Sequence, residues 1–211
     1  MNPFRLYLVT DSEMVGAKIF FDYVIQAVKA GVTAVQLREK NISQKEFIAK
    51  GRELKKKLSP YKVPLIINDS LEVALACEAD GVHLGRGDGC PLAAREALGA
   101  NRWLGLSVED PLQVQSFPEG SYDYLGVSGV FPSSTKPEIT RHWSEGSLKM
   151  LKEKTQVSLI GIGGINRETL PQLKGWGLDG VAVVSAILSQ KTLRQVSEVT
   201  RELKKDLEIY L

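Results

Sequence analysis

Cationic and polar side chains alternate after the second short apolar segment of the chain. Gln36, Arg38 and Lys40 lie two residues apart, so an extended backbone points them to one side. Arginine binds phosphate through paired hydrogen bonds, and lysine binds it as a point charge. The cluster predicts a site for a phosphate or pyrophosphate. The alternative interpretation is a solvated strand end with Glu39 neutralising a neighbour.

Two carboxylates after the next two apolar segments extend this prediction. Asp69 follows Asn68, and Asp88 ends a glycine-rich loop. Mg²⁺ takes one or two protein carboxylates and completes its shell with phosphate oxygens and water. We therefore expect Asp69 and Asp88 to bind Mg²⁺ beside the cationic cluster. The alternative is that Asp69 or Ser70 caps the following helix.

Small residues after the last two apolar segments predict a second anion site. Gly163-Gly164 allows the backbone to approach an anion without a Cβ atom in the way. In α/β barrels the loops after strands 7 and 8 often bind phosphate through backbone N–H groups at the start of a short helix. This site suits a monophosphate, whereas the cationic site suits a more highly charged group.

A loop rich in hydroxyl groups lies between the two predicted anion sites along the chain. Ser133, Ser134, Thr135 and Lys136 offer several donors and one cation, as an anion-binding lid or as an ordinary polar loop. The roles of His83, Arg141 and His142 stay open, and a lone histidine within a strand is more often a hydrogen-bonded core residue. No serine or cysteine has a clear histidine partner in the sequence, so no activated nucleophile is expected. These features point to a reaction in which a metal helps pyrophosphate to leave and a second phosphorylated substrate attacks.

The elements that must position these residues alternate along the chain. Short, mostly apolar segments predict strands buried on both faces. They cover residues 6–10, 34–37, 65–67, 81–84, 103–107, 124–128, 158–162 and 181–185. Amphipathic stretches between them predict helices. These cover residues 17–30, 43–58, 71–79, 92–98, 111–117, 144–154, 167–176 and 192–211.

Alternating strands and helices predict parallel βαβ units. A count of eight units favours a (β/α)₈ TIM barrel in one domain, residues 1–211, over an open doubly wound sheet. No G-x-G-x-x-G sequence follows the first strand, so nothing indicates dinucleotide binding.

Composition agrees with a globular enzyme that binds small molecules. Of 211 residues, 43% are hydrophobic and 25% charged, and the net charge of +2 gives no reason to expect a nucleic-acid or membrane partner. Two cysteines, Cys77 and Cys90, are too few for a disulfide framework. With no recognisable leader or membrane segment, a cytoplasmic location is expected. The sequence predicts no oligomeric state.

Taken together, these motifs resemble the thiamine-phosphate synthase (thiamine-phosphate pyrophosphorylase) family over nearly the whole chain. The resemblance rests on residues 36–40, 68–69, 81–85 with Asp88, 133–136 and 161–165, in the order and near the spacing of that family. It implies a (β/α)₈ barrel that joins an aminomethylpyrimidine pyrophosphate to a thiazole phosphate. The chemistry implied is dissociative: pyrophosphate leaves, and the thiazole nitrogen captures a pyrimidine-stabilised cation.

The resemblance also implies roles for individual residues. Asp69 and Asp88 would bind Mg²⁺, and Ser107 would lie against the pyrimidine and the departing group. The pyrimidine pyrophosphate would be held by Gln36, Arg38, Lys40, Asn68 and Lys136. The thiazole phosphate would be held by Ser133, Thr135, Gly164, Val184 and Ser185, with Ser134 beside them in the same loop. Arg38, Lys40, Ser107 and Lys136 would act in catalysis.

Some positions depart from the family pattern without removing a charged ligand. Ser107 is followed by Val108-Glu109 where members often carry a small residue and histidine, and Ser128-Gly129 replaces Gly-Pro. Gly87 replaces an acidic neighbour of Asp88. Three other functions are weighed: a thiazole tautomerase of the same fold, a non-catalytic phosphate-binding barrel, and an unrelated phosphate-binding barrel enzyme. Retention of both the carboxylate pair and the cationic cluster favours the synthase.

Overall fold

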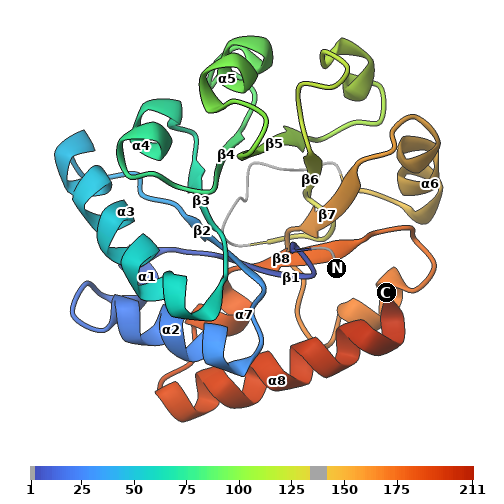
Figure 1. The fold of residues 1–211 in the computed structure, drawn as a ribbon. Coiled ribbons are helices and arrows are strands. Elements are labelled where there is room, and N and C mark those ends of the chain that lie inside the picture. The colour runs from blue at the N-terminus through green and yellow to red at the C-terminus, as the bar shows by residue number, and fades with distance from the viewer. Residues whose placement is uncertain (1–2, 134–141) are drawn as a thin grey trace.

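A computed structural model describes residues 3–133 and 142–211, in which eight parallel strands close into a barrel (Figure 1). Every strand pairs with its neighbours in the sequence, and β1 pairs with β8. The strands are β1 Leu6–Val9, β2 Ala34–Leu37, β3 Leu65–Asn68, β4 Gly81–Leu84, β5 Trp103–Val108, β6 Tyr124–Ser128, β7 Ser158–Ile162 and β8 Gly180–Val183. This confirms the barrel and excludes the open sheet.

Helices surround the barrel, and the long C-terminal helix packs beside α2 (Figure 1). They are α1 Ser12–Val15, α2 Phe20–Ala30, α3 Gln44–Leu58, α4 Leu71–Ala76, α5 Pro91–Leu98, α6 Glu145–Glu153, α7 Ser185–Leu188 and α8 Leu193–Tyr210. Three 3₁₀ turns accompany them: η1 Ser59–Tyr61, η2 Gln113–Ser116 and η3 Leu170–Leu173. Ser43 and Glu46 form a capping box at the start of α3.

Two of the predicted helices, residues 111–117 and 167–176, are wrong, because each region forms only a single 3₁₀ turn. In the first, the Ser116 hydroxyl donates to the carbonyl of Gln113 and competes with helical pairing. In the second, Pro171 lacks an amide hydrogen and Gly175 has a φ of 80°. The short helices α1 and α7 were not predicted, and β8 ends two residues earlier than expected.

Apolar side chains fill two layers, one inside the barrel and one between the strands and helices. The inner layer is formed by Phe4, Tyr7, Val9, Ala34, Ile66, Tyr124, Ile160 and Ala182. Large rings fit inside because some inward positions on neighbouring strands are glycine. A Cβ atom on Gly105 would lie 2.2 Å from Cζ of Tyr124. The barrel is thus a packed core that leaves space only at its mouth.

Three aspartates clamp the amino-terminal ends of the strands. Asp80, Asp123 and Asp179 each precede a strand and accept a hydrogen bond, at 2.7, 2.7 and 2.8 Å, from a backbone N–H near the start of the preceding strand. Each aspartate also pairs with a cation of a neighbouring helix, at 2.5 Å. The Thr33 hydroxyl accepts from Leu6 N in the same way between β1 and β2. These aspartate clamps join successive strand pairs at the end remote from the mouth.

Removing one clamp is expected to cost stability and leave the chemistry unchanged. Asp123→Ala leaves the buried N–H of Leu104 without its acceptor and the Arg95 guanidinium without its carboxylate. Loss of such charge-assisted bonds costs about 1.5–3 kcal/mol. Urea denaturation measures the loss. As control, Glu145→Ala breaks an exposed pair with Lys149 and should cost at most about 0.5 kcal/mol. Equal stabilities for the two variants contradict this role for the clamp.

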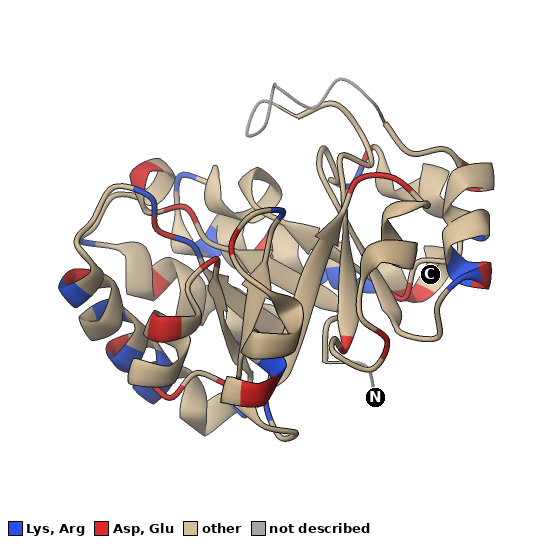
Figure 2. Ribbon diagram, turned by 90° about the horizontal axis from the view of Figure 1, so that it is seen from above, with Lys and Arg blue, Asp and Glu red and all other residues tan. Residues whose placement is uncertain are grey.

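Basic and acidic residues alternate along the outer helices, where the ribbon is coloured blue and red (Figure 2). This arrangement agrees with the near balance of 27 Lys and Arg against 25 Asp and Glu. Among the described residues, no helix combines the length and apolar character that a membrane crossing requires.

Candidate active site

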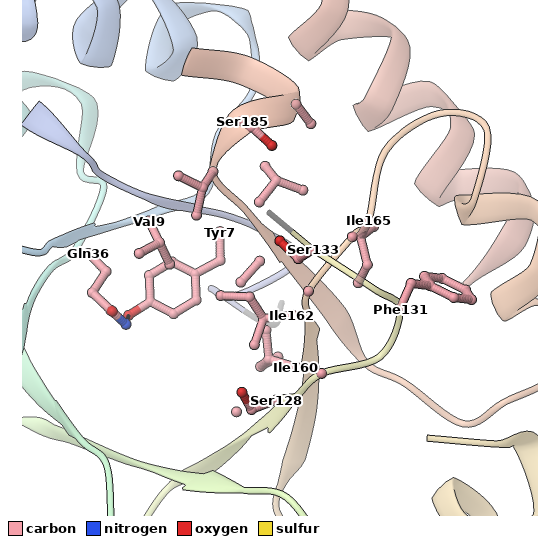
Figure 3. A pocket seen from close by; sticks show the side chains of 18 of the residues that line it. Tyr7, Val9, Gln36, Ser128, Phe131, Ser133, Ile160, Ile162, Ile165 and Ser185 are labelled. Atoms are coloured by element: carbon pink, nitrogen blue, oxygen red, sulfur yellow. Dashed lines mark hydrogen bonds between the residues drawn. The ribbon is translucent and has the colours of Figure 1, made fainter. Parts of the chain in front are cut away.

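A cavity of about 310 Å³ opens at the carboxyl ends of the strands (Figure 3). Predicted site residues from six strands or their following loops line it: Gln36, Arg38, Asn68, Ser107, Ser133, Gly164, Val184 and Ser185. Three predicted residues, Lys40, Asp69 and Asp88, lie on exposed loops outside this lining. Ser134, Thr135, Lys136 and Arg141 lie outside the described residues. A cavity of this size falls at the lower end of the range for small-molecule sites.

The cavity has an apolar wall and hydroxyl groups along its edge (Figure 3). Val9, Ile160 and Ile162 form part of the wall, and Ser128 lies beside them. None of these four residues is among the predicted site residues. Strand alternation is the signal that finds them, because inward residues two apart near a strand end must face the mouth.

Arg38 and Lys40 differ in their surroundings, although both were predicted to bind the same group. The backbone N–H of Arg38 donates to the buried Thr10 hydroxyl at 3.1 Å, whereas Lys40 is exposed. Glu39 pairs with Lys50 of α3 at 2.6 Å and accepts a hydrogen bond from Ser12. The carboxylate of Glu39 therefore has partners on the outer layer, so the alternative in which it neutralises the cationic cluster is not what the structure shows.

Asp69 sits in an unusual backbone conformation at the end of β3. Its φ is 65°, a left-handed value that is uncommon for residues other than glycine. Its N–H donates to the His83 carbonyl at 2.8 Å, which holds this turn against β4. The next residue, Ser70, caps α4 by accepting from Val73 N. Ser70 is therefore the capping residue of α4, and the Asp69 side chain does not serve as the cap.

The carboxyl groups of Asp69 and Asp88 lie within hydrogen-bond distance of each other. Partial burial, a side-chain hydrogen bond with Asp88 and the Asp88 charge raise the pKa of Asp69 to about 6, against the opposing effects of Asn68 and Arg38. Asp88 is oriented by the Gly85 N–H, which donates to its Oδ2 at 2.7 Å. Two facing carboxylates suit a hard divalent cation such as Mg²⁺. No cluster of three or more potential metal-binding side chains occurs within residues 3–133 and 142–211. A metal ion at this position would therefore have the two carboxylates as its ligands from the described residues.

The loops after β7 and β8 meet at the other side of the cavity. Gly163 and Gly164 have φ values of 109° and 61°, and the Phe131 N–H donates to the Gly163 carbonyl at 3.0 Å. Ser185 begins the short helix α7 directly after β8. The first N–H groups of any helix lack partners within it. The predicted glycine loop and helix start therefore line the same cavity, which is the arrangement required for a backbone-built anion site.

The polar loop that starts after β6 is fastened at its base. His142 Nδ1 lies 3.0 Å from the Gly129 carbonyl, and the Trp143 indole donates to the Ser128 carbonyl at 2.9 Å. His142 also lines the cavity. The sequence predicted no role for His142. In the structure it contacts the backbone at the base of this loop.

One prediction about Ser107 is wrong. Ser107 Oγ lies 3.0 Å from His83 Nε2, so this serine does have a histidine partner. The sequence hides the pair because 24 residues separate them, whereas β4 and β5 pair His83 with Gly105 and place Ser107 on the same inner face. The other ring nitrogen, Nδ1, faces the Tyr124 hydroxyl at 3.2 Å, where a catalytic triad places a carboxylate.

Comparisons with known proteins agree with this geometry. A family model described as thiamine monophosphate synthase matches residues 6–187. The chain is 43% identical to thiamine-phosphate synthase of Vibrio campbellii over 94% of this chain and 97% of that protein. It is 40% identical to the enzyme of the same name from Ruminiclostridium cellulolyticum, over 95% of each chain.

Similarity extends to a solved structure. Thiamine phosphate pyrophosphorylase from Pyrococcus furiosus superposes with a TM-score of 0.85 and 31% identity, covering 100% of this chain and 98% of that one. This barrel thus carries the Asp69–Asp88 pair, with Arg38 and the Gly163-Gly164 loop lining its cavity. Its relatives in sequence are transferases of one kind. The chain belongs to the thiamine monophosphate synthase family.

Proposed function

We propose that this chain transfers an aminomethylpyrimidine group from its pyrophosphate to the nitrogen of a thiazole phosphate. The bond between the methylene carbon and the pyrophosphate oxygen breaks, and its electron pair leaves with pyrophosphate. The thiazole nitrogen then supplies a lone pair to the same carbon, which gives thiamine phosphate. The observation that carries the proposal is a single cavity that Arg38 lines at one side and Gly164 and Ser185 line at another. Asp69 lies outside this lining but close enough to Arg38 to feel its charge.

Each side of the cavity suits one substrate. The cationic side, with Arg38 and the amides of Gln36 and Asn68, would hold the pyrimidine pyrophosphate, and Lys40 and Lys136 would add positive charge to that substrate's site. The backbone side would hold the thiazole phosphate through Gly164, Val184 and Ser185, together with the hydroxyls of Ser133, Ser134 and Thr135. Holding both substrates in one cavity replaces a collision in solution by an oriented encounter.

A dissociative step fits the wall of the cavity. The side chains of Val9, Ile160 and Ile162 offer no nucleophile to a cationic intermediate, and they displace water from that part of the cavity. The polar groups lie at the rim, where the leaving pyrophosphate carries its charge. Ser107 would lie against the pyrimidine and the departing group and stabilise them by hydrogen bonding.

Asp69 and Asp88 would hold Mg²⁺ at the cationic side. The contact between the two carboxyl groups is the observation that supports a cation here, because a divalent ion removes the repulsion between two carboxylates. Bound Mg²⁺ supplies positive charge that neutralises the departing pyrophosphate. The protein's own part is to orient the carboxylates, through the left-handed turn at Asp69 and the Gly85 N–H at Asp88.

Pyrophosphate release tests this proposal directly. The purified protein should release pyrophosphate only when Mg²⁺ and both phosphorylated precursors are present. Release without the thiazole phosphate, or full activity in a chelator, contradicts the mechanism. A thiazole tautomerase instead converts a single phosphorylated substrate without releasing pyrophosphate, so the same assay separates the two functions.

A further inference from the structure

A continuous chain of hydrogen bonds crosses the inside of the barrel beneath the cavity. The Gln36 amide nitrogen lies 3.0 Å from the Tyr7 hydroxyl, which lies 3.1 Å from the Tyr124 hydroxyl. Tyr124 lies 3.2 Å from His83 Nδ1, and His83 Nε2 lies 3.0 Å from Ser107 Oγ. These five residues come from five different strands, β2, β1, β6, β4 and β5. Figure 3 shows the first contact, with the end of the Gln36 side chain at the Tyr7 ring.

The donors and acceptors in this chain have one consistent direction. Either tyrosine could donate in the contact between the two hydroxyls, but an amide nitrogen only donates, so Tyr7 accepts from Gln36. The proton of the buried Tyr7 hydroxyl then has an acceptor among the described residues only when Tyr7 donates to Tyr124. Tyr124 then gives its proton to His83 Nδ1. A neutral imidazole has one donor and one acceptor nitrogen, so an accepting Nδ1 leaves the proton on Nε2. His83 therefore donates to Ser107 Oγ.

We propose that Tyr7, Tyr124 and His83 are positioning residues that fix Ser107 as a hydrogen-bond donor to the substrate. Ser107 Oγ accepts from His83, and no other hydrogen bond to it occurs in the described part of the chain. Its own proton is therefore available to a group in the cavity that it lines. This inference rests on the proposed function for the identity of that group, an oxygen of the departing pyrophosphate or a nitrogen of the pyrimidine.

The same arrangement prevents Ser107 from acting as a nucleophile. A serine nucleophile needs a base that accepts its proton, whereas here the nitrogen that faces it already carries one. The hydrogen-bond chain therefore turns a serine–histidine pair, which elsewhere forms covalent intermediates, into a fixed donor. This agrees with a reaction that forms no bond between protein and substrate.

The surroundings hold the chain in place. Tyr7 and Tyr124 are 2% and 0% exposed, and burial raises the pKa of both phenols, so they remain protonated donors. Gly105 and Gly126 provide the space: an added Cβ would lie 2.5 Å from the Tyr124 hydroxyl at the first position and 2.7 Å from His83 Cε1 at the second. Packing on both sides restricts the Tyr124 and His83 rings, which leaves few alternative arrangements of the hydrogen bonds between them.

The tautomer of His83 is a test that does not depend on activity. The chain has two histidines, so the ¹⁵N-histidine NMR spectrum of the full-length protein is assigned with His142→Gln. We expect wild type at neutral pH to show His83 protonated on Nε2 alone. We expect Tyr124→Phe to populate the Nδ1–H form, because the variant removes the Tyr124 hydroxyl that faces Nδ1. A wild-type ring protonated on Nδ1 or on both nitrogens overturns the proposal, as does a Tyr124→Phe spectrum like that of wild type.

Tyr23→Phe is the matched control. The side chain of Tyr23 is also buried, and its hydroxyl donates a partly buried hydrogen bond to the Gln190 carbonyl at 2.9 Å, but it lies outside the barrel interior. It should lose stability as Tyr124→Phe does and keep the His83 tautomer. A change of tautomer in this control shows that general loosening, rather than the chain, sets the proton position.

Turnover gives the second readout. Tyr124→Phe should lower kcat about fivefold, the value of one neutral hydrogen bond, with KM for the pyrimidine pyrophosphate changed less than about twofold. In a Ser107→Ala background the same substitution should have no further effect on kcat, because the residue through which it acts is gone. Additive losses overturn the proposal. Absence of pyrophosphate release by wild type contradicts the proposed function instead, and the NMR result still decides the tautomer.

Discussion

Asp69→Asn and Asp88→Asn are each expected to lower turnover at least about tenfold, or roughly 1.4 kcal/mol in the barrier. Each variant keeps the shape of the side chain and removes one of the two negative charges proposed to hold Mg²⁺. Steady-state pyrophosphate release as a function of Mg²⁺ concentration measures the effect. The midpoint of the Mg²⁺ dependence should move to higher concentration in both variants. Wild-type rates in both variants show that the metal assignment is wrong.

The same substitutions should stabilise the metal-free protein. The pKa of Asp69 is raised from 3.8 to about 6 in the folded state, so folding favours its protonated form. Its contribution to stability is fully present below about pH 4 and is lost as the pH rises through 6. Urea denaturation in a chelator should therefore show a decline in wild type across this range that is reduced in Asp69→Asn. Since the side chain is more than one-third exposed, solvent screening makes the decline smaller than the full shift implies.

Glu72→Gln is the matched control for both measurements. Glu72 lies in the first turn of α4, three residues after Asp69, and is exposed. Its substitution removes one nearby negative charge without altering the carboxylate pair. If Glu72→Gln reproduces the Mg²⁺ shift or the change in pH dependence, the effects come from the general field of the mouth and not from the pair.

Gly164→Ala is expected to lower kcat/KM for the thiazole phosphate roughly a hundredfold, or about 2.7 kcal/mol. A Cβ atom at this position would lie 2.4 Å from the Pro132 carbonyl oxygen and 2.8 Å from Phe131 Cβ. The backbone must move to relieve these contacts, and it is this backbone that is proposed to receive the phosphate. KM for the pyrimidine pyrophosphate should change much less, because that substrate is assigned to the other side of the cavity.

Gly99→Ala separates backbone strain from the effect on the site. Gly99 has a φ of 71°, close to the 61° of Gly164, but no heavy atom lies within 4 Å of an added Cβ. It should lose about 1–3 kcal/mol of stability, because its φ of 71° and ψ of −176° are values that side-chain-bearing residues rarely adopt, and it should retain full activity. If Gly164→Ala is as active as this control, the anion site after β7 is assigned to the wrong loop.

Local pattern was sufficient to predict the strands. Each is a short apolar run bounded by glycine, proline or polar residues, and burial on both faces leaves little freedom in where it begins. Helix prediction failed for two segments of the outer layer that form only 3₁₀ turns. Residues 111–117 and 167–176 have helical spacing of apolar residues, but Pro171 and the side-chain bond at Ser116 interrupt backbone pairing, and spacing alone does not weigh such effects.

The site was predictable only for residues that lie next to each other in the chain or follow a strand. Gln36, Arg38, Asn68 and Gly164 all satisfy that condition. The contact between Tyr7 and Tyr124 joins residues 117 positions apart, and only the closed barrel with its register brings them together. The His83–Ser107 pair was missed for the same reason. The aspartate clamps do leave a signal, since Asp80, Asp123 and Asp179 each stand directly before a strand.

The aspartate clamps place the main polar anchors of the fold at the end of the barrel that takes no part in the proposed chemistry. Loops at the mouth can accumulate replacements, as at Glu109, Gly129 and Gly87, without loosening these anchors. The residues that join the strands and the residues that would determine substrate preference thus lie at opposite ends of the barrel. An engineer who wishes to alter specificity can therefore randomise the mouth while the β3–β4, β5–β6 and β7–β8 pairs stay joined at the opposite end.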